Sequence, residues 1–383
     1  MRRGPLTASD LFPPFLPSAF PRASLPSRVV SFEVAFFSVL PSPYQRDLFR
    51  ALSRRAELRL RVFYLEADAP DSPWPRKPLD DYETILPGGR FHVGAARWPW
   101  NWPLPDLSGS GVVVLNSLMS FTAQWLMRFG LRGKPWVFWG ERLRRGGAVH
   151  NFLSAPLHRA TAIASVGSFA EADYHERFPE PAHFSIPYHC ALDAFLAAPR
   201  PARGDGEVVF LFCGQMIARK GLDLLLGAFQ QLESNARLLL VGREAELPAL
   251  LAPLPGAVRD RITYAGFQPP EELPRFFAQA DVFVLPSRYD GWGVVVNQAL
   301  GAGLPILCSD QVGAGRDLVR DGVNGLRFKA GNVPALKEAM ARCLEAPERL
   351  KHWGDASRAQ ALEWTPEAGA ARWIAAWREL GLL

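Results

Sequence analysis

Cysteine is scarce in this sequence, with four residues among 383, at positions 190, 213, 308 and 343. None of them belongs to a CxxC pair, and this wide spacing excludes both a cysteine-bound metal cluster and a disulfide framework. Few and unpaired cysteines are typical of a reducing compartment. We therefore expect a cytoplasmic protein.

Long apolar runs are also lacking. No stretch approaches the roughly 18–20 residues that are needed to span a bilayer. The N-terminus has Arg2 and Arg3, but the stretch SDLFPPFLPSAFPRASLPSR that follows is interrupted by prolines and lacks the apolar region of a signal peptide. We expect residues 1–28 to form a mobile, proline-rich tail or to result from a start codon assigned too early.

Acidic residues are outnumbered, because 38 of them face 43 lysines and arginines, which gives a net charge of +5. A mildly basic surface suits anions or an acidic membrane leaflet. A basic helix predicted from Gln45 to Arg61 favours peripheral contact with the inner face of the plasma membrane, although solvated charge on an ordinary helix gives the same pattern. No recognition helix, zinc-finger spacing or aromatic RNA-binding signature is present, so we expect no nucleic acid partner.

What the sequence does contain is an alternation of short apolar runs and amphipathic segments. From Val29 onward this alternation predicts parallel sheets covered by helices, which is an α/β fold. A chain of this length suits two domains that face a cleft. We predict an N-terminal domain at 29–195, a linker rich in proline, glycine and charge at 196–207, and a C-terminal domain at 208–383.

The strands expected in the N-terminal domain are FEVAFFSVL, LRLRVFYL, GVVVLN, PWVFWGE, AIASVG and HFSIPYH. Those expected in the C-terminal domain are EVVFLFCG, ARLLLVG, RITYAGF, DVFVLPS and LPILCSD. The chain from 333 to 383 is predicted to be mostly helical, and we expect its last helix to pack back on the N-terminal domain.

Tryptophan is concentrated in the N-terminal half, which holds seven of the twelve. Trp98, Trp100 and Trp102 belong to RWPWNWPLP, whose prolines rule out a regular helix and predict a loop. Two interpretations stay open. Burial of the rings pins this loop to the core, or the rings form an exposed platform for sugar rings or for the membrane interface.

A basic, glycine-containing stretch follows the first strand of the C-terminal domain. In CGQMIARKGLDLLLGAF the strand ends at Gly214, a short loop carries Arg219 and Lys220, and Gly221 opens an amphipathic helix. A phosphate would find cations and backbone N–H donors together at this point. The spacing does not match a Walker A loop, so a solvated lysine at a helix start remains the alternative.

A second stretch, YDGWGVVVNQALGAGLP, combines a carboxylate with two glycines and a helical run. Gly291 and Gly293 allow a ligand to approach the backbone, next to the carboxylate of Asp290. Eight residues of helix advance about 12 Å, so Asp290 and Gln298 can contact opposite ends of an elongated ligand. A nucleotide sugar has this shape, with the hexose at Asp290, the diphosphate between, and the ribose at Gln298.

These stretches, followed in order by LLLVG, ITYAGF, ADVFVLPSRYDGWGVVVNQALGAGLPILCSD and VGAGRDLVRDGVNGLRF, resemble the donor-binding domain of GT-B glycosyltransferases. The similar family is the large retaining one that builds bacterial exopolysaccharide and lipopolysaccharide. The resemblance covers 208 to about 380 well. It is looser in the N-terminal half, through SVLPSPYQRDLFRAL, the WGE at 139–141 and IPYHCALDAF.

The resemblance implies a GT-B fold, two Rossmann-like domains facing a central cleft, and a set of site residues. Asp290 and Gln298 stand where the family commonly has two glutamates, and Gln215 stands where it often has arginine. Glu141 would contact the acceptor, with an ion pair to Arg142 or Arg144 as the alternative. The implied catalytic residues are Lys220, Arg219, Asp290 and Glu141; the implied donor-binding residues are Gly214, Gln215, Gly291, Trp292, Gly293, Val294, Gln298 and Gly313.

Further positions are assigned more simply. Gly313 and Gly315 are expected to form a tight turn before a helix, either closing over the donor or serving only as a turn. His189 and Asp193 are expected to be structural. The first strand-helix loop, with Pro43, Tyr44 and Gln45, is expected to border the cleft.

The function that the resemblance implies is transfer of a sugar from a nucleoside diphosphate sugar, with retention, to a glycan or lipid-linked acceptor. No DxD-like pair of aspartates is placed to hold a metal, so we expect metal independence and no cofactor. The alternative is a degenerate GT-B subunit that binds the nucleotide sugar without turnover, which the glutamines at 215 and 298 favour.

Overall fold

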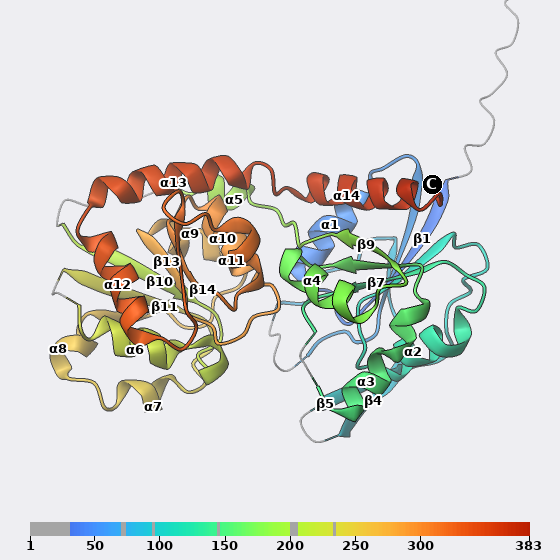
Figure 1. Cartoon of the computed structure of the whole chain (residues 1–383), viewed down its shortest axis with the longest axis horizontal. Coiled ribbons are helices and arrows are strands. Elements are labelled where there is room, and N and C mark those ends of the chain that lie inside the picture. The colour runs from blue at the N-terminus through green and yellow to red at the C-terminus, as the bar shows by residue number, and fades with distance from the viewer. Residues whose placement is uncertain (1–30, 70–73, 94–95, 144–145, 200–205, 233–234) are drawn as a thin grey trace, which may run out of the picture.

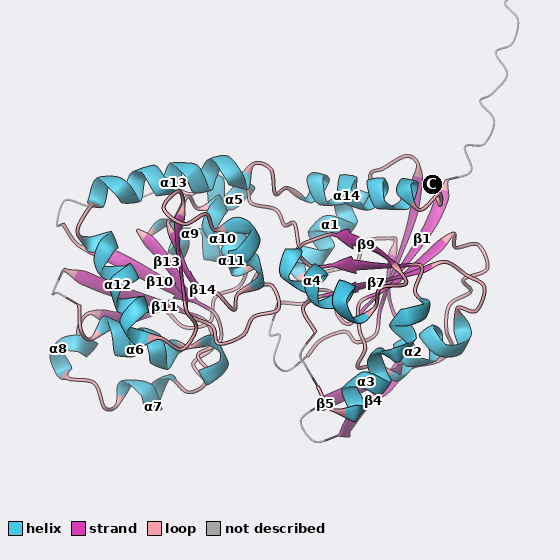
Figure 2. Ribbon diagram, viewed as in Figure 1, coloured by secondary structure: helices cyan, strands magenta, loops and turns pink. Residues whose placement is uncertain are grey.

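The computed structural model of the protein describes residues 31–69, 74–93, 96–143, 146–199, 206–232 and 235–383. Its elements form two α/β units side by side, each built on one parallel sheet (Figures 1 and 2). The α/β fold expected from the sequence is therefore confirmed. The predicted tail at 1–28 and part of the predicted linker lie outside the described residues.

The first sheet has seven parallel strands in the order β3-β2-β1-β6-β7-β8-β9. Its central strands are runs of valine, phenylalanine and tryptophan that are buried on both faces, which is the pattern of a parallel sheet between helix layers. The strand bounds are β1 Phe32–Ser38, β2 Leu58–Tyr64, β3 Glu83–Ile85, β6 Val112–Leu115, β7 Trp136–Gly140, β8 Ala162–Ser165 and β9 Ala182–Ser185.

The second sheet has six parallel strands in the order β12-β11-β10-β13-β14-β15. Chain order reverses between β10 and β13, as it does between β1 and β6 in the first sheet, and such reversals open a crevice at the carboxyl ends of the strands. The bounds are β10 Val208–Cys213, β11 Ala236–Val241, β12 Ile262–Tyr264, β13 Val282–Leu285, β14 Ile306–Ser309 and β15 Gly325–Phe328.

Helices connect the strands. Those of the first unit are α1 Pro43–Ser53, α2 Phe121–Trp125, the π-helical turn η1 Leu126–Gly130, α3 Ala148–Ser154, η2 Ala155–Arg159 and α4 Ser168–Arg177. Those of the second are η3 Ala218–Lys220, α6 Leu222–Phe229, α7 Leu247–Leu251, α8 Gly256–Arg259, α9 Leu273–Ala278, α10 Val295–Gly301, α11 Gly313–Leu318, α12 Val333–Leu344, α13 Pro347–Ala361 and α14 Pro366–Glu379. The helix that follows α4, α5 Asp193–Ala197, already packs on α9 and α10 of the second unit (Figure 1).

The tryptophan-rich stretch is not the loop that its prolines predicted. It forms β5 Ala96–Asn101, which pairs with β4 Gly88–Val93 in an antiparallel hairpin apart from both sheets. Pro99 lies in the middle of β5, and a two-stranded hairpin tolerates it because every strand there is an edge strand with N–H groups that need no partner. Trp100 and Trp102 are exposed, at 39% and 67%.

The basic helix expected from Gln45 to Arg61 is shorter than predicted. Helix α1 ends at Ser53, and Arg61 lies in β2, where it pairs with Glu33. The apolar side of α1 is buried, including Leu48 and Phe49. Because α1 presents no apolar side chain row to solvent, it offers a bilayer only charge.

The last helix, α14, lies across the first unit although it follows the second in sequence (Figure 1). It begins where Thr365 caps its N-terminus, with the Thr365 hydroxyl accepting from the Ala368 N–H at 3.2 Å. The Trp373 ring then meets Phe36 of β1 at 5.3 Å and Trp139 of β7 at 5.6 Å. The N-terminal sheet is thus covered on this side by the C-terminal end of the chain.

Candidate active site

A cavity of about 660 Å³ lies between the two units, at the carboxyl ends of both sheets. From the first unit, Tyr44 after β1 and Glu141 after β7 line it. From the second, it is lined by loops that follow β10, β11 and β13 and by helix α10. The carboxyl ends of parallel strands are where α/β folds bind ligands, because several loops converge there.

Three charged groups meet on the C-terminal side of this cavity. The Lys220 ammonium lies 2.5 Å from Asp290 Oδ2, and the Arg219 guanidinium lies 3.9 Å from Asp290 Oδ1. The Ser287 hydroxyl also donates to Asp290, at 3.4 Å. Lys220 and Asp290 follow β10 and β13, which are neighbours in the sheet, so the pair forms although 70 residues separate its members.

The backbone around Asp290 is fixed by two hydrogen bonds. The Asp290 N–H donates to the Gln311 carbonyl at 3.1 Å, and the Gly313 N–H donates to the Asp290 carbonyl at 3.2 Å. Gly293 has φ +91°, a conformation that favours glycine, and its backbone lines the cavity. The backbone that carries the Asp290 side chain is therefore fixed independently of Lys220.

Gly313 and Gly315 differ from their prediction. Both lie within α11, not in a turn before it. Glycine is required at 313 because a side chain there would collide with the Gly291 carbonyl, and at 315 because it would collide with the sulfur of Cys308. Gly313 thus lets α11 approach the Asp290 loop closely, and Gly315 lets it pack on Cys308 of β14. Gly313 does not line the cavity.

Glu141 faces Asp290 from the other side of the cavity. Its side chain reaches solvent through the cavity, yet protein surrounds it, and this desolvation raises the pKa of the Glu141 carboxyl above its ordinary value. The negative charge of Asp290 raises this pKa further, whereas a hydrogen bond with Tyr188 and the charge of Lys220 act in the opposite direction. The result is a carboxyl that holds its proton to higher pH than an exposed glutamate.

The alternative ion pair of Glu141 with Arg142 is not what the structure contains. Arg142 binds Asp173 at 3.0 Å and donates to Gln311 at 3.0 Å, and its guanidinium stacks over Phe169. The other alternative partner, Arg144, lies outside the described residues. Arg142 thus links the two units, since Gln311 belongs to the second.

Five of the remaining donor-site candidates line the cavity: Gly214, Gln215, Gly293, Val294 and Gln298. Gln298 is half-buried on α10. Within the part of the chain that the structure describes, Asp290 and Gln298 are thus brought to one cavity.

The other two candidates, Trp292 and Gly291, do not line the cavity. The Trp292 ring is only 1% exposed, and its indole N–H donates to Asn297 at 2.9 Å. Asn297 in turn donates to the Tyr188 carbonyl at 3.1 Å. Gly291 lies beneath Glu141, where any side chain would strike the carboxylate. The sequence does not reveal that Trp292 points inward, because both neighbours are glycines.

Pro43, Tyr44 and Gln45 form the first turn of α1 and not the loop before it, where they were predicted. Pro43 and Tyr44 border the cavity, whereas Gln45 is buried and accepts a hydrogen bond from Ser38 at 2.7 Å. His189 packs against Trp364 with ring centroids 4.9 Å apart, and burial lowers its pKa to about 4. A neutral, stacked histidine fits the structural role that was expected for it. Asp193 opens α5.

Sequence reasoning missed several lining residues. Gly242 and Arg243 follow β11, and Phe267, Gln268 and Glu271 follow β12. The signal was available, since LLLVGR and ITYAGF end predicted strands that belong to the same sheet as the Lys220 loop. The sequence does not reveal the order of the strands in the sheet, and this order decides which loops lie next to one another.

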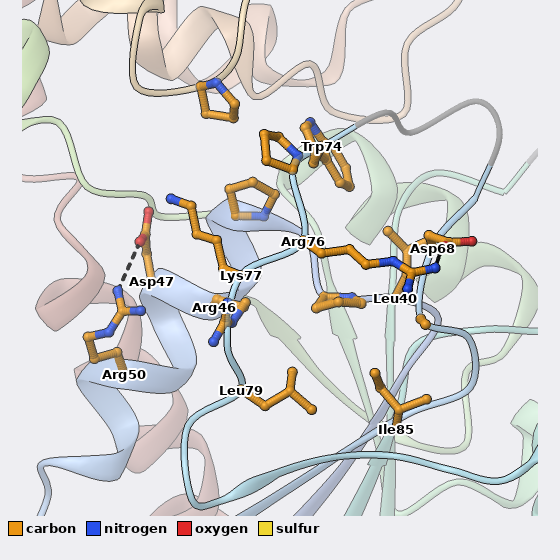
Figure 3. Close-up of a pocket in the computed structure, with 15 residues that line it drawn as sticks. Leu40, Arg46, Asp47, Arg50, Asp68, Trp74, Arg76, Lys77, Leu79 and Ile85 are labelled. Atoms are coloured by element: carbon orange, nitrogen blue, oxygen red, sulfur yellow. Dashed lines mark hydrogen bonds and ion pairs between the residues drawn. The ribbon is translucent and has the colours of Figure 1, made fainter.

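A smaller cavity of about 170 Å³ adjoins the large one on the first unit (Figure 3). Its cations have partners: Arg46 binds Glu83 at 2.6 Å, and Arg50 lies 3.5 Å from Asp47. Lys77 forms an ion pair with Glu271 of the second unit. The two cavities share Trp74, Lys77 and Asp47 in their linings, so this side pocket opens beside the cleft.

Among the residues that the structure describes, no three histidine, cysteine, aspartate or glutamate side chains gather in a way that could hold a metal ion. Nor does any helix within the described ranges have both the length and the apolar character to cross a bilayer.

Two Rossmann-like units, a cleft at the carboxyl ends of both sheets and a terminal helix that returns to the first unit place this molecule in the GT-B class. The comparison with solved structures confirms this class. Sucrose-phosphate synthase from Thermosynechococcus elongatus superposes with a TM-score of 0.71 at 20% identity, over 91% of this chain and 99% of that one. Anabaena HepE, solved in complex with UDP, superposes with a TM-score of 0.68 at 14% identity, over 91% and 100%.

A family match is confined to the second unit and the end of the first. Residues 197–360 match the family described as glycosyl transferases group 1. O-antigen chain mannosyltransferase B from Escherichia coli is 36% identical over 173 residues, which are 41% of this chain and 45% of that protein. The alignments span about half or less of the length of the first curated relatives.

Proposed function

We propose that this protein transfers a glycosyl group from a nucleoside diphosphate sugar to a glycan or lipid-linked glycan, with retention at the anomeric carbon. The observation that carries the proposal is the meeting of Lys220, Arg219 and Asp290 in the large cavity. The family match of the second unit supports the reaction class. The complex of the similarly folded HepE with UDP supports a nucleotide ligand.

In this proposal Lys220 and Arg219 bind the diphosphate. Without donor, Lys220 is neutralised by Asp290 at 2.5 Å; a diphosphate, with more negative charge, competes for the same ammonium. Cations held in place stabilise the charge that collects on the leaving diphosphate as the glycosidic bond breaks. Because the protein supplies these cations, we propose that no metal is needed.

Release of Lys220 leaves the Asp290 carboxylate available to the hydroxyls of the transferred sugar. Its backbone hydrogen bonds to Gln311 and from Gly313 keep it in position during this exchange. Gln298, farther along the same cavity, has an amide that can bind one ribose hydroxyl. A neutral amide in place of a carboxylate costs about 1–2 kcal/mol of donor binding, since charge-assisted hydrogen bonds are stronger.

On the opposite wall, Glu141 is assigned to the acceptor. Its raised pKa makes the ionised carboxylate a stronger base than an ordinary glutamate, which suits acceptance of the proton from the attacking hydroxyl. Attack from the face that the diphosphate leaves gives retention without a covalent enzyme intermediate. In this scheme no protein nucleophile is required.

The second candidate function is nucleotide-sugar binding without turnover. Gln298 and Gln215, both in the cavity lining, are the residues that favour it. The ion pair of Lys220 with Asp290 argues for an active site, because binding alone does not need a carboxylate beside the diphosphate cation.

The experiment that tests the proposal is a panel of UDP-, GDP-, ADP- and dTDP-sugars, assayed for binding and for slow hydrolysis with a chelator present. We expect binding of one donor and its hydrolysis without metal. Binding with neither hydrolysis nor transfer to lipid-linked or glycan acceptors supports the non-catalytic alternative. If no nucleotide sugar binds, the donor site has been assigned wrongly.

A further inference from the structure

Exposed apolar side chains are unevenly distributed over the molecule. Among the described residues, ten of the fourteen exposed large apolar side chains lie between 85 and 152. This stretch contributes the hairpin β4–β5, helix α2 with η1, and helix α3, which lie together at the bottom of the first unit in Figure 1. A concentrated patch of this kind marks an interaction surface, whereas scattered exposed apolar residues need no explanation.

The hairpin and α2 contribute one continuous group of rings. Phe91 of β4 stacks on Trp100 of β5, with centroids 6.4 Å apart, and meets Phe121 of α2 at 5.7 Å. Phe121 also meets Trp98 at 5.4 Å. The rings pack on one another and yet stay open to solvent, with Phe91 at 56% and Phe121 at 47% exposed.

Helix α2 and η1 extend the group as a stripe. Phe121, Trp125 and Phe129 recur every four residues, and each is about half exposed, while Leu126 and Met127 between them are buried. Helix α3 adds Phe152, which is 66% exposed. We call the side chains of Phe91, Trp100, Phe121, Trp125, Phe129 and Phe152 the aromatic face.

Positive charge accompanies the aromatic face. Residues 86–159 contain nine lysines and arginines and two acids, whereas the whole chain has an excess of only five positive charges. The Arg128 guanidinium lies 4.6 Å from the ring centre of Phe152, and that of Arg132 lies 5.6 Å from the ring centre of Phe129. The surface therefore combines exposed rings with cations that lie over two of them.

The aromatic face is also tied to the cleft edge of the sheet. The Asn101 side chain, at the base of the hairpin, donates to the carbonyls of Leu65 and Leu86, which follow β2 and β3. The loops leading to α2 and α3 follow the carboxyl ends of β6 and β7. The elements of the aromatic face thus start from the same edge at which the large cavity opens.

We propose that the aromatic face docks on an anionic phospholipid bilayer. Tryptophan and phenylalanine rings partition into the interfacial region, and neighbouring arginines are attracted by anionic headgroups. The charge in this stretch is nearly all of one sign, nine lysines and arginines against two acids in residues 86–159, and it complements an anionic leaflet; this favours lipid over a protein partner. The proposal goes beyond the glycosyl transfer proposed above and does not depend on it. It also moves the membrane contact from α1, whose apolar side is buried, to another part of the first unit.

The test is sedimentation of the full chain with vesicles of phosphatidylcholine alone and of phosphatidylcholine with about 30% phosphatidylglycerol. We expect binding to the anionic vesicles that weakens as salt is raised. The variant pair F129S and F152S, combined, is expected to lower vesicle partitioning at least about tenfold, since two buried rings are lost from the lipid contact. Arg132→Gln is expected to weaken it about fivefold at low salt.

The second unit offers a matched control. Val323 and Leu362 are exposed at 46% and 65%, and V323S with L362S removes as many exposed apolar side chains far from the aromatic face in sequence. This double variant is expected to bind vesicles like the unchanged protein. Phe129→Trp, which keeps a ring, is expected to retain binding, and thermal melts verify that every variant folds.

Failure has clear signatures. The proposal is overturned if the unchanged protein ignores anionic vesicles, or if the variants with F129S and F152S bind as the control does. Light scattering distinguishes the competing occupant: a change from oligomer to monomer in the F129S and F152S variant, without vesicle binding by the unchanged protein, assigns the aromatic face to a second copy of this chain. Because the readout is lipid binding, inactivity toward nucleotide sugars leaves this result unaffected.

Discussion

The two halves of the molecule share one architecture but differ in what they display. The second unit carries the family match at 197–360 and the paired charges of the donor cavity. The first unit carries most of the exposed rings, and within it residues 86–159 hold nine lysines and arginines against two acids. The half with the sequence match holds the charge cluster that we assign to the donor, whereas the other half holds most of the exposed rings. The difference teaches that fold similarity over the whole chain does not carry function equally to both halves.

The largest expected effect tests whether α14, which follows the second unit in sequence, stabilises the first unit. Trp373→Ala removes a ring that is 1% exposed and packs on Phe36 and Trp139 of the first unit. We expect a loss of about 3–5 kcal/mol in the free energy of unfolding, measured by denaturant titration, because a large buried side chain is replaced by a cavity. Trp125→Ala, at a site that is 46% exposed, is the control and should cost less than about 1 kcal/mol. A loss at Trp373 as small as that of the control would show that α14 does not support the first unit.

The next prediction concerns the donor side. Lys220→Ala should lower turnover by about 10²–10³-fold, by analogy with the loss of one preorganised donor to a developing anion. The measurement is initial rate with the donor found in the nucleotide-sugar panel. Lys337→Ala on α12, a half-exposed lysine of the same unit, is the matched control. A change of less than threefold at Lys220 would remove it from the diphosphate site.

The acceptor side is tested through pH. The pKa of Glu141 is raised above 4.5 by desolvation and by Asp290, so the carboxyl gains its proton at higher pH than an exposed glutamate. If the reaction needs the ionised form, the rate falls as pH is lowered through this raised pKa. Glu141→Gln should lower the rate about 10²-fold and abolish that inflection. Glu338→Gln on α12 should keep both the rate and the pH profile, and an unchanged profile in the Glu141→Gln variant would rule out the proposed base.

The smallest effect sharpens the donor site itself. Gln298→Glu should tighten donor binding by up to about tenfold, because a carboxylate forms charge-assisted bonds with ribose hydroxyls. Isothermal titration with the preferred donor measures it. Gln279→Glu, an exposed site outside the cavity, controls for the added charge. A large loss of binding would mean that the amide donor of Gln298 is used and that the ribose assignment is wrong.

Much of the fold could be predicted from the sequence, because parallel strands buried on both faces appear as short apolar runs. Each of the eleven predicted runs overlaps one strand. The hairpin β4–β5 was missed because Pro99 argues against a strand. The proline is tolerated because the hairpin has only two strands, so β5 is an edge strand. The strands β3 and β15 were missed because Glu83–Ile85 and Gly325–Phe328 are too short and too mixed in polarity to show a pattern.

The candidate site was predictable where chemistry and spacing coincide, as at Asp290 and Lys220. Their direct contact was not predictable, because it depends on β10 and β13 being neighbours. The direction of Trp292 and the buried position of Gly313 could not be read either, since both depend on packing against segments distant in sequence. The sequence left open whether the rings of the tryptophan-rich stretch are buried in the core or exposed, and the structure shows Trp100 and Trp102 exposed.

The position of α14 has a consequence for exchanging parts between relatives. A hybrid that joins the first half of this chain to the second half of another by a single junction near residue 200 would bring a foreign helix against Phe36 and Trp139. The inherited module is therefore discontinuous: it consists of the chain from residue 31 to the segment before α5, which packs on the second unit, together with the stretch after Thr365, at which α14 begins. We expect a hybrid to acquire the acceptor preference of its first-unit parent only when it is built with two junctions, the second of them just before Thr365.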